Sequence, residues 1–191
     1  RIVKSGYKEV VLTGVDITDY GKDLPGKPNF SNLINRILKL VPDLKRLRLS
    51  SIDCSEITDD FWPLLSEERL MPHFHLSLQS GNNLILKRMK RRHTRERAIE
   101  FCNKVLSIRK NATFGADIIA GFPTETKKMF NDSMFLIDEC NLTHLHIFPY
   151  SIREGTPAAR MPQVEKAIII KRARELRKKG NCQMINHLLN K

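Results

Sequence analysis

The sequence predicts an α/β fold of parallel strands, and three observations point to this class. Five apolar runs of strand length recur along the chain, and a segment with helical periodicity follows each run. No glycine-rich phosphate loop follows the first run, which favours a barrel or partial barrel over an open dinucleotide-binding sheet. A chain of 191 residues, 41% of them hydrophobic, can bury one core, so we expect a single compact unit.

The predicted elements follow from periodicity. Residues at positions 30, 33, 34, 37, 38 and 41 are apolar, as on the buried face of a helix, and Pro42 ends that pattern. Strands are predicted at Lys8–Thr13, Arg46–Ser51, Phe74–Gln79, Thr113–Ala120 and His144–Tyr150. Further helices are predicted at Thr58–Glu68, Asn82–Lys90, Thr94–Ile108, Thr126–Cys140 and Glu165–Lys179. This alternation predicts right-handed crossovers between parallel strands.

Composition narrows the class of partner. Lysine and arginine number 33 against 21 acidic residues, a net charge of +12, which favours a polyanionic partner. No apolar run approaches the roughly 20 residues that span a bilayer, and no signal peptide opens the sequence, so we expect a cytoplasmic protein without a membrane partner. Four isolated cysteines are expected to be small core residues or stray thiols: Cys54, Cys102, Cys140 and Cys182.

Polar and small residues gather after each predicted strand. In barrels and α/β sheets, ligands bind at the carboxyl ends of the strands. The five strand ends are Leu12–Asp16, Leu49–Asp53, Leu78–Gly81, Ala120–Glu125 and Phe148–Ser151. Alternation places polar with apolar groups on one face of three strands: His75, Ser77 and Gln79, then Asp117, Ile119 and Gly121, then His146, Phe148 and Tyr150. A ligand-holding barrel is the preferred interpretation, and ordinary surface turns of similar composition remain the alternative.

Two His-x-His pairs raise the alternative of a metal hydrolase. His73 and His75 form one pair, and His144 and His146 form the other. Both pairs lie at the starts of their strands, several residues before the carboxyl ends, so we expect core or supporting histidines instead of a catalytic metal. No nucleophile elbow or zinc-protease motif accompanies them. We therefore assign no metal ligand and no catalytic residue within these 191 residues.

A basic run follows the third strand. Residues 87–93 hold five cations in seven positions, near the expected ligand-binding rim. The run is either a solvated helix face or a site for RNA phosphates and a small-molecule carboxylate. The residues predicted to bind RNA are Lys87, Arg88, Lys90, Arg92 and Arg160.

Several segments together resemble the radical-SAM tRNA methylthiotransferases, in the order and spacing of that family. The matching segments are Glu9–Gly14, Leu49–Ser51, His75–Gly81, Leu86–Arg91 and Asp117–Thr126. The segment His146–Pro162 is most similar to the branch that modifies threonylcarbamoyladenosine beside the tRNA anticodon. The resemblance covers about Tyr7 to Lys179, so chance agreement of short motifs is not a serious explanation.

The resemblance implies a partial (β/α)6 TIM-like barrel whose first strand-helix unit precedes Arg1. Residues 1–179 would form the core barrel, and residues 180–191 a helical extension leading to a TRAM domain outside this chain. The family carries two [4Fe-4S] clusters, one on a Cys-x-x-x-Cys-x-x-Cys loop that would also lie upstream. The chain by itself is therefore expected to be inactive.

The activity implied for the whole enzyme is methylthiolation of C2 of N6-threonylcarbamoyladenosine at position 37 of a tRNA anticodon stem-loop. S-adenosylmethionine would supply both a 5′-deoxyadenosyl radical and the methyl group. Three alternatives stay open: another modified adenosine, a ribosomal protein as substrate, or a noncatalytic RNA-binding barrel.

The resemblance also assigns roles around S-adenosylmethionine. Thr13 and Gly14 match the segment that meets the methionine amino group, while Ser51 and Gln79 match strand ends near its carboxylate or ribose. Arg91 matches an arginine suited to a carboxylate. The remaining predicted contacts flank the adenosine: Asp117, Ile119, Gly121, Phe148 and Tyr150. Thr124 stands where the family commonly has glycine, which leaves the shape of that turn open.

Overall fold

A computed structural model describes residues 1–190. Its strands are β1 Glu9–Leu12, β2 Arg46–Leu49, β3 His73–Gln79, β4 Thr113–Ala120 and β5 Leu142–Pro149. Its α-helices are α1 Phe30–Leu40, α2 Asn83–Arg88, α3 Arg95–Ile108, α4 Lys127–Glu139 and α5 Lys166–Leu189. Short 3-10 helices occupy Val3–Ser5, Ile17–Asp19, Asp59–Ser66 and Pro157–Arg160. The predicted alternation of strand and helix is confirmed.

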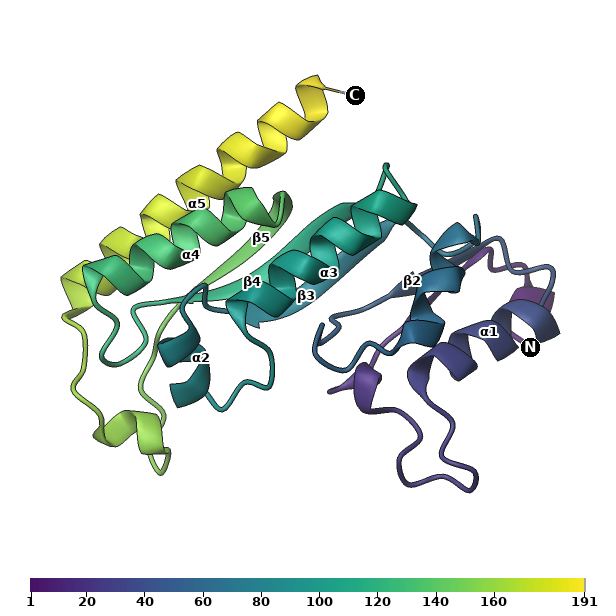
Figure 1. Ribbon diagram of the computed structural model, residues 1–191, viewed down its shortest axis with the longest axis horizontal. Coiled ribbons are helices and arrows are strands. Elements are labelled where there is room, and N and C mark those ends of the chain that lie inside the picture. The colour runs from purple at the N-terminus through teal and green to yellow at the C-terminus, as the bar shows by residue number, and fades with distance from the viewer. Residues whose placement is uncertain (191) are drawn as a thin grey trace.

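All the strand pairings are parallel. β1 pairs with β2, and β4 lies between β3 and β5. Isolated parallel bridges from Leu47 to Leu70 and from Ile52 to Leu76 join the two sheets, so the strands follow one another in chain order (Figure 1). The result is a partial α/β fold with its strand ends on one rim.

The helix ends follow the local sequence. Asn29 and Asn32 exchange side-chain and backbone hydrogen bonds as a capping box before α1. Thr94 and Thr126 accept from backbone N–H groups at the starts of α3 and α4. The segment predicted as a helix at Thr58–Glu68 is a 3-10 helix with Pro63 inside it, because proline removes a backbone donor.

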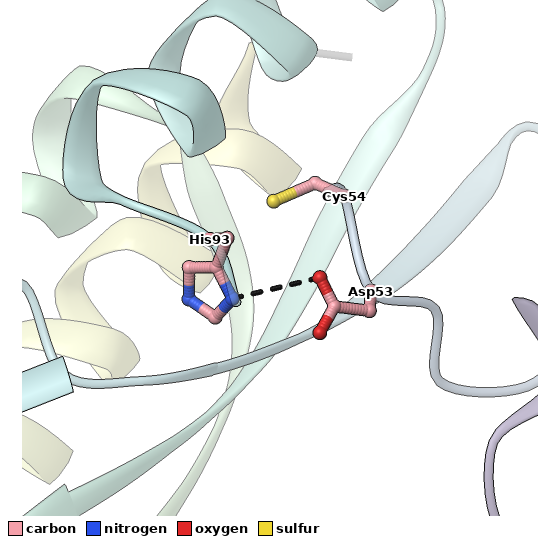
Figure 2. Close-up of side chains that lie close together, drawn as sticks. All are labelled: Asp53, Cys54 and His93. Carbon is pink, nitrogen blue, oxygen red and sulfur yellow. Dashed lines mark ion pairs between the residues drawn. The ribbon is translucent and has the colours of Figure 1, made fainter. Parts of the chain in front are cut away.

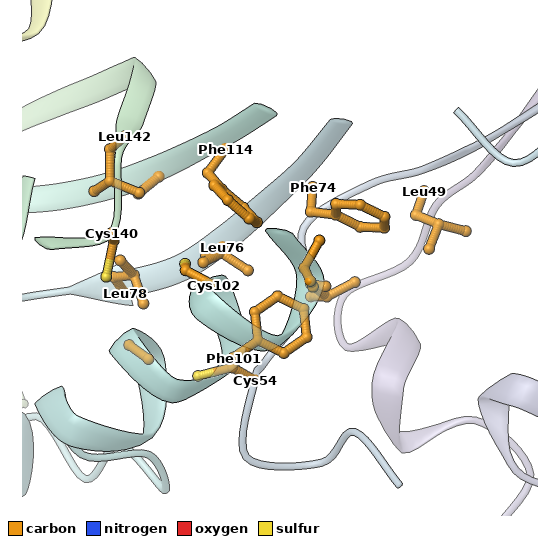
Figure 3. Close-up of a cluster of buried hydrophobic side chains, with 14 of the residues drawn as sticks. Leu49, Cys54, Phe74, Leu76, Leu78, Phe101, Cys102, Phe114, Cys140 and Leu142 are labelled. Atoms are coloured by element: carbon orange, nitrogen blue, oxygen red, sulfur yellow. The ribbon is translucent and has the colours of Figure 1, made fainter. Parts of the chain in front are cut away.

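The core lies between the sheet and its helices. Alternate side chains of β3 are buried, among them Phe74, Leu76 and Leu78, and they meet apolar residues of α3 and β4 (Figure 3). Phe74 stands 6.4 Å from Phe114, measured between ring centroids. The intervening residues of β3 are only half buried and line the opposite face. That face carries the polar groups described below.

The last helix is longer than its predicted end at Lys179. α5 continues to Leu189 and packs along β5, where Gly180 approaches Leu145 so closely that an added Cβ would lie 3.0 Å from Cδ1. One helix therefore crosses the expected boundary between residues 179 and 180, and the division into domains stays a prediction. No helix within residues 1–190 is both long and apolar enough to cross a membrane.

Candidate functional site

The strand ends carry unusual backbone geometry. Gln79, the last residue of β3, has φ of 67°, and Gly121 just after β4 has φ of 75°. A non-glycine residue in the left-handed region is strained, and such strain concentrates where a site needs a particular shape. A Cβ on Gly121 would lie 2.5 Å from the Ile169 side chain, so this turn also needs glycine for close approach to α5. Both positions were predicted site residues.

A cavity of about 400 Å³ lies at this rim. Four predicted cofactor contacts line it: Gln79, Ile119, Phe148 and Tyr150. The Tyr150 ring packs edge-on against Phe122, with centroids 5.5 Å apart. Its hydroxyl is buried and has no hydrogen-bond partner among the described residues. Because buried polar groups are nearly always paired, this hydroxyl is suited to a ligand atom in the cavity.

A second cavity of about 400 Å³ adjoins the first and shares Gln79 and Ile119 with it. Its basic lining residues are Arg88, Lys90 and Arg91. The two cavities together form one opening, with an aromatic and apolar wall on one side and a cationic wall on the other. This combination suits a ligand with a flat ring at one end and a carboxylate at the other.

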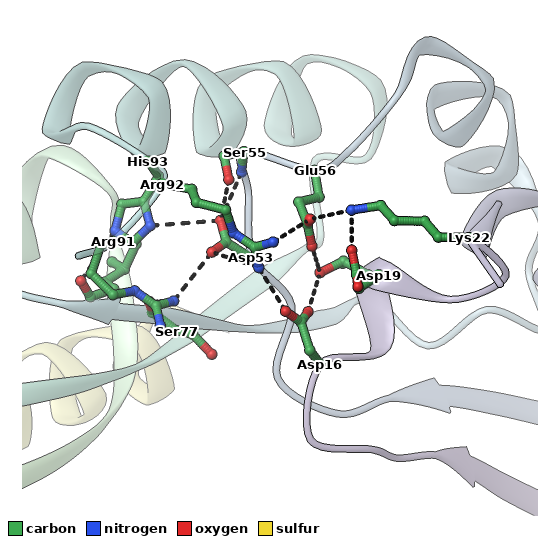
Figure 4. A network of polar contacts seen from close by, with 12 residues as sticks. Asp16, Asp19, Lys22, Asp53, Ser55, Glu56, Ser77, Arg91, Arg92 and His93 are labelled. Atoms are coloured by element: carbon green, nitrogen blue, oxygen red, sulfur yellow. Dashed lines mark hydrogen bonds and ion pairs between the residues drawn. The ribbon is translucent and has the colours of Figure 1, made fainter. Parts of the chain in front are cut away.

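Arg91 is held in place before any ligand binds. Its Nη2 donates to the Ser77 carbonyl at 2.8 Å and to Asp53 Oδ2 at 3.2 Å (Figure 4). Its Nε is buried without a hydrogen-bond partner among the described residues. One edge of the guanidinium is thus anchored to β3 and to the loop after β2. A second carboxylate would have to approach the remaining donors.

Asp53 is the buried acid of this network. Its side chain is 5% exposed, and it accepts hydrogen bonds from the backbone and hydroxyl of Ser55 at 2.9 and 2.7 Å. Nδ1 of His93 lies 3.6 Å from the same oxygen (Figure 2). Burial opposes ionisation, but His93 and Ser55 outweigh it and hold the pKa of Asp53 well below its usual range.

Arg92 connects the loop after β2 to the loop after β1. It forms ion pairs of 2.6 Å with Asp16 and with Glu56. Thr18 donates to Glu56 at 2.8 Å and thereby extends the network. Of the residues predicted to bind RNA, Arg92 is therefore already neutralised by two carboxylates.

The other residues predicted to bind RNA differ in whether their charged groups already have a partner in the protein. Arg88 donates to the Thr124 hydroxyl at 2.5 Å, across the rim. Lys87, Lys90 and Arg160 are exposed, and among residues 1–190 none of them has an ion-pair partner. Thr124 itself has φ of 70°, the left-handed conformation that glycine adopts freely.

The remaining predicted cofactor contacts lie outside both cavities. Thr13 and Gly14 follow β1 and are exposed, and Ser51 follows β2. Gly121 is buried beside α5, where its N–H donates to the Glu125 carboxylate at 3.0 Å. Arg172 of α5 pairs with that carboxylate at 2.8 Å. The structure therefore gathers about half of the predicted contacts around one opening, and the roles of all of them stay predictions.

Asp117 lies on β4 two residues before Ile119, which lines the first cavity. It accepts hydrogen bonds from His75 at 2.9 Å and from His146 at 3.1 Å, on the polar face of the sheet. Two further histidines, His73 of β3 and His144 of β5, lie closer to the starts of their strands, and their rings pack edge-on with centroids 4.9 Å apart. Burial and the nearby His144 lower the pKa of His73 to about 4, so its ring is neutral at pH 7.

The cysteines do not fit an iron–sulfur cluster. Cys54, Cys102 and Cys140 are buried in the apolar core, and Cys182 is exposed on α5. Burial raises the pKa of the Cys54 thiol to about 12, whereas a cluster needs thiolates. The prediction of small core residues or stray thiols is confirmed, because three of the cysteines are core residues and Cys182 is an exposed free thiol.

Sequence reasoning missed part of the site. Asp53 holds Arg91, Glu56 holds Arg92, and His93 lies beside Asp53, yet none of these three was singled out as a site residue. The available signal was the position of Asp53 as the last residue of the strand end Leu49–Asp53. Their partners are 36 to 40 residues away in the chain, and no sequence pattern links them.

The chain is 60% identical over 185 residues to the threonylcarbamoyladenosine tRNA methylthiotransferase MtaB of Rickettsia prowazekii, which covers 96% of this chain and 44% of that protein. MtaB of Bacillus subtilis is 39% identical over 92% of this chain and 39% of its own length. A tRNA-2-methylthio-N(6)-dimethylallyladenosine synthase of Shouchella clausii is 40% identical over 84% of this chain and 31% of its length. The chain thus spans less than half the length of these relatives.

Solved structures agree on the fold. Coproporphyrinogen III oxidase (HemN) of Escherichia coli, a radical SAM enzyme, superposes with a TM-score of 0.67 over 91% of this chain and 41% of that one, at 19% sequence identity. Residues 1–137 match the Radical SAM superfamily. These agreements bear out the resemblance, and the chain belongs to the radical SAM superfamily.

Proposed function

We propose that this chain is the S-adenosylmethionine-binding part of an enzyme that methylthiolates C2 of N6-threonylcarbamoyladenosine at position 37 of tRNA. The homology to MtaB supports the substrate branch. The observation that carries the chemistry is the paired opening in which Gln79, Tyr150 and Arg91 meet. S-adenosylmethionine has both an adenine ring and a carboxylate, as this opening requires.

Each wall of the opening has a distinct role in this proposal. Phe148 and Ile119 supply apolar surface for the adenine, and the unpaired Tyr150 hydroxyl supplies a donor. Arg91, anchored by Asp53 and Ser77, presents its other donors to the methionine carboxylate. Thr13, Gly14 and Ser51 would close the site from the neighbouring strand ends.

The five parallel strands in chain order are the pattern expected for the last five units of a (β/α)6 barrel. The first unit and the cysteines of two [4Fe-4S] clusters would belong to the rest of the protein, because no described cysteine fits such a site. This chain alone would therefore bind no cluster and modify no tRNA.

The RNA partner is the tRNA anticodon stem-loop. Net charge +12 and the free cations Lys87, Lys90 and Arg160 supply phosphate contacts near the opening. Such an enzyme would act in the cytoplasm, where its tRNA substrate resides.

Nucleoside mass spectrometry of tRNA tests the substrate. Cells lacking the full-length gene should lose 2-methylthio-threonylcarbamoyladenosine and keep 2-methylthio-dimethylallyladenosine. Loss of the second nucleoside alone would move the substrate to the other branch of the family. An unchanged profile in both would reject a tRNA methylthiotransferase.

Binding measurements on the cluster-loaded full-length protein test the opening. Arg91→Lys keeps the charge but loses the planar fork, and Tyr150→Phe removes only the hydroxyl. Both should weaken S-adenosylmethionine binding about tenfold or more, while Lys39→Ala on the distant α1 should leave it unchanged. Equal affinity in all four proteins would place the cofactor elsewhere.

A further inference from the structure

A second polar constellation lies below the opening, on the face of β3, β4 and β5 opposite the apolar core. Histidines of β3 and β5 approach one another across β4 in two tiers. The lower tier is His73 with His144, and the upper tier is His75 with His146, whose ring centroids are 4.8 Å apart. Asp117 of β4 lies in the upper tier only.

The three upper side chains converge on one point. His75 Nε2 is 2.9 Å and His146 Nδ1 is 3.1 Å from Asp117 Oδ1, and the three atoms all lie within 4.8 Å of one another. Ligand atoms about 2.1 Å from a transition metal and at right angles to each other are about 3 Å apart. The two N···O separations therefore match adjacent positions on one metal ion.

The backbone of β4 favours this convergence. Gly115, two residues before Asp117, faces the same side, and a Cβ there would lie 2.6 Å from His75 Nδ1. Glycine lets the His75 ring lie close to the β4 backbone, with its other nitrogen directed at the carboxylate. The orientation of the ring is thus fixed by packing on the side away from the convergence point.

The charge at the site suits a cation. The Asp117 carboxylate lies between the two imidazoles, and each histidine has one ring nitrogen within hydrogen-bonding distance of its Oδ1. Among the described residues, no lysine or arginine pairs with it. The competing cluster of Asp53, Cys54 and His93 is different, because Arg91 already neutralises Asp53 and the thiol of Cys54 stays protonated.

We propose that His75, Asp117 and His146 bind a divalent first-row transition metal ion as a two-histidine, one-carboxylate site. This set binds iron(II), cobalt(II) or zinc(II) on one side of the ion and leaves the remaining positions open. The His146 side chain is 64% exposed, so water or a substrate oxygen can reach those positions. This site goes beyond the proposed function and is independent of the iron–sulfur clusters.

The position of the site connects it to the opening. Asp117 and His146 precede Ile119 and Phe148 by two residues, so their side chains point to the same face one tier lower. A metal ion here would form the floor beneath the cavity that Ile119 and Phe148 line. It would also tie β3, β4 and β5 together on the face that lacks apolar packing.

Cobalt(II) is the probe for the test, with cluster-loaded full-length protein. High-spin Co²⁺ gives an electron paramagnetic resonance signal, whereas oxidised four-iron clusters are diamagnetic. One Co²⁺ per chain should bind at this site, and Zn²⁺ should displace it. Asp117→Asn and His146→Gln should each weaken this binding at least tenfold, and His146→Gln changes a side chain that is 64% exposed.

His73→Gln is the matched control, since it alters a histidine of the other tier, on the strand that carries His75, and that histidine contacts His144 and Thr113 instead of Asp117. It should leave Co²⁺ affinity unchanged. The proposal fails if no stoichiometric Co²⁺ binds, if Asp117→Asn and His146→Gln bind it as tightly as the parent protein, or if His73→Gln weakens binding equally. None of these outcomes changes the tRNA nucleoside profile that tests the proposed function.

Discussion

Asp53 Oδ2 lies 3.2 Å from Nη2 of Arg91 and joins the loop after β2 to the basic segment after α2. Asp53→Asn keeps the shape of the side chain but leaves Arg91 without its nearest countercharge. We expect the variant to lose on the order of 2 kcal/mol of unfolding free energy, measured by urea denaturation at pH 7. Asp23→Asn, an exposed loop change, should stay within about 0.5 kcal/mol of the parent.

Acid should remove this contribution of Asp53. The pKa of Asp53 is lowered in the folded state, so the unfolded chain binds the proton first as pH falls. The stabilisation is complete above the ordinary aspartate pKa of about 3.9 and is lost progressively below it. The gap in stability between parent and Asp53→Asn should therefore narrow from pH 5 to pH 3. A gap that is constant over this range would show that the charge of Asp53 is not its source.

Thr124 adopts φ of 70°, where a β-branched residue is strained. Thr124→Gly and Thr124→Ala both remove the hydroxyl that accepts from Arg88, so they differ only in backbone freedom. The glycine variant should be more stable than the alanine variant by about 1 kcal/mol, the cost of the left-handed conformation. Thermal or urea unfolding measures the difference.

The control for this comparison has the opposite sign. Ser107 is exposed within α3, where glycine is less favourable than alanine by about 1 kcal/mol. Ser107→Gly should therefore be less stable than Ser107→Ala. If alanine were the better residue at both positions, the strain at Thr124 would be absent in solution.

Gly81 marks the contact between the end of β3 and α4. A Cβ there would lie 2.5 Å from the carbonyl oxygen of Asp132 and 2.6 Å from Cα of Ser133. Because these are backbone atoms of a helix, Gly81→Ala should cost about 3 kcal/mol of unfolding free energy. Gly155→Ala meets open space at φ of 78°, so it should cost only about 1 kcal/mol. Equal losses would mean that α4 moves aside freely.

The periodicity of the sequence predicted the order, type and approximate bounds of most elements. It placed β4 at Thr113–Ala120, as observed, because buried parallel strands read as apolar runs between turn residues. It failed at Asp59–Ser66, where Pro63 enforces a tighter helix, and at the end of α5, where Gly180 packs on β5 instead of ending the helix.

Only those site residues that lie at the end of a single strand could be predicted from the sequence. Gln79, Ile119 and Tyr150 follow from alternation and from the carboxyl-end rule. Arg92 forms ion pairs with Asp16, 76 residues away, and with Glu56, 36 residues away, and charged residues in such loops have many alternative partners. Such pairings depend on the folded positions of the loops, which local patterns do not encode.

The same distinction between paired and free cations leads to a prediction for RNA binding. Lys87 and Lys90 are exposed without ion-pair partners among residues 1–190, whereas Arg92 is held by two carboxylates at 2.6 Å. Each free lysine that meets a phosphate releases counterions, so Lys87→Ala and Lys90→Ala should each reduce the salt slope of anticodon stem-loop binding by about 1. Arg92→Ala should change that slope much less.

Fluorescence anisotropy of a labelled stem-loop across a potassium chloride series measures these slopes in the full-length protein. Lys39→Ala on α1 is the control, because that lysine lies on a different surface from the opening. Arg92→Ala should instead show its loss in unfolding free energy, since Asp16 and Glu56 lose their shared partner. An Arg92 slope change as large as those of the lysines would mean that RNA displaces the carboxylates, and that the network opens when the substrate binds.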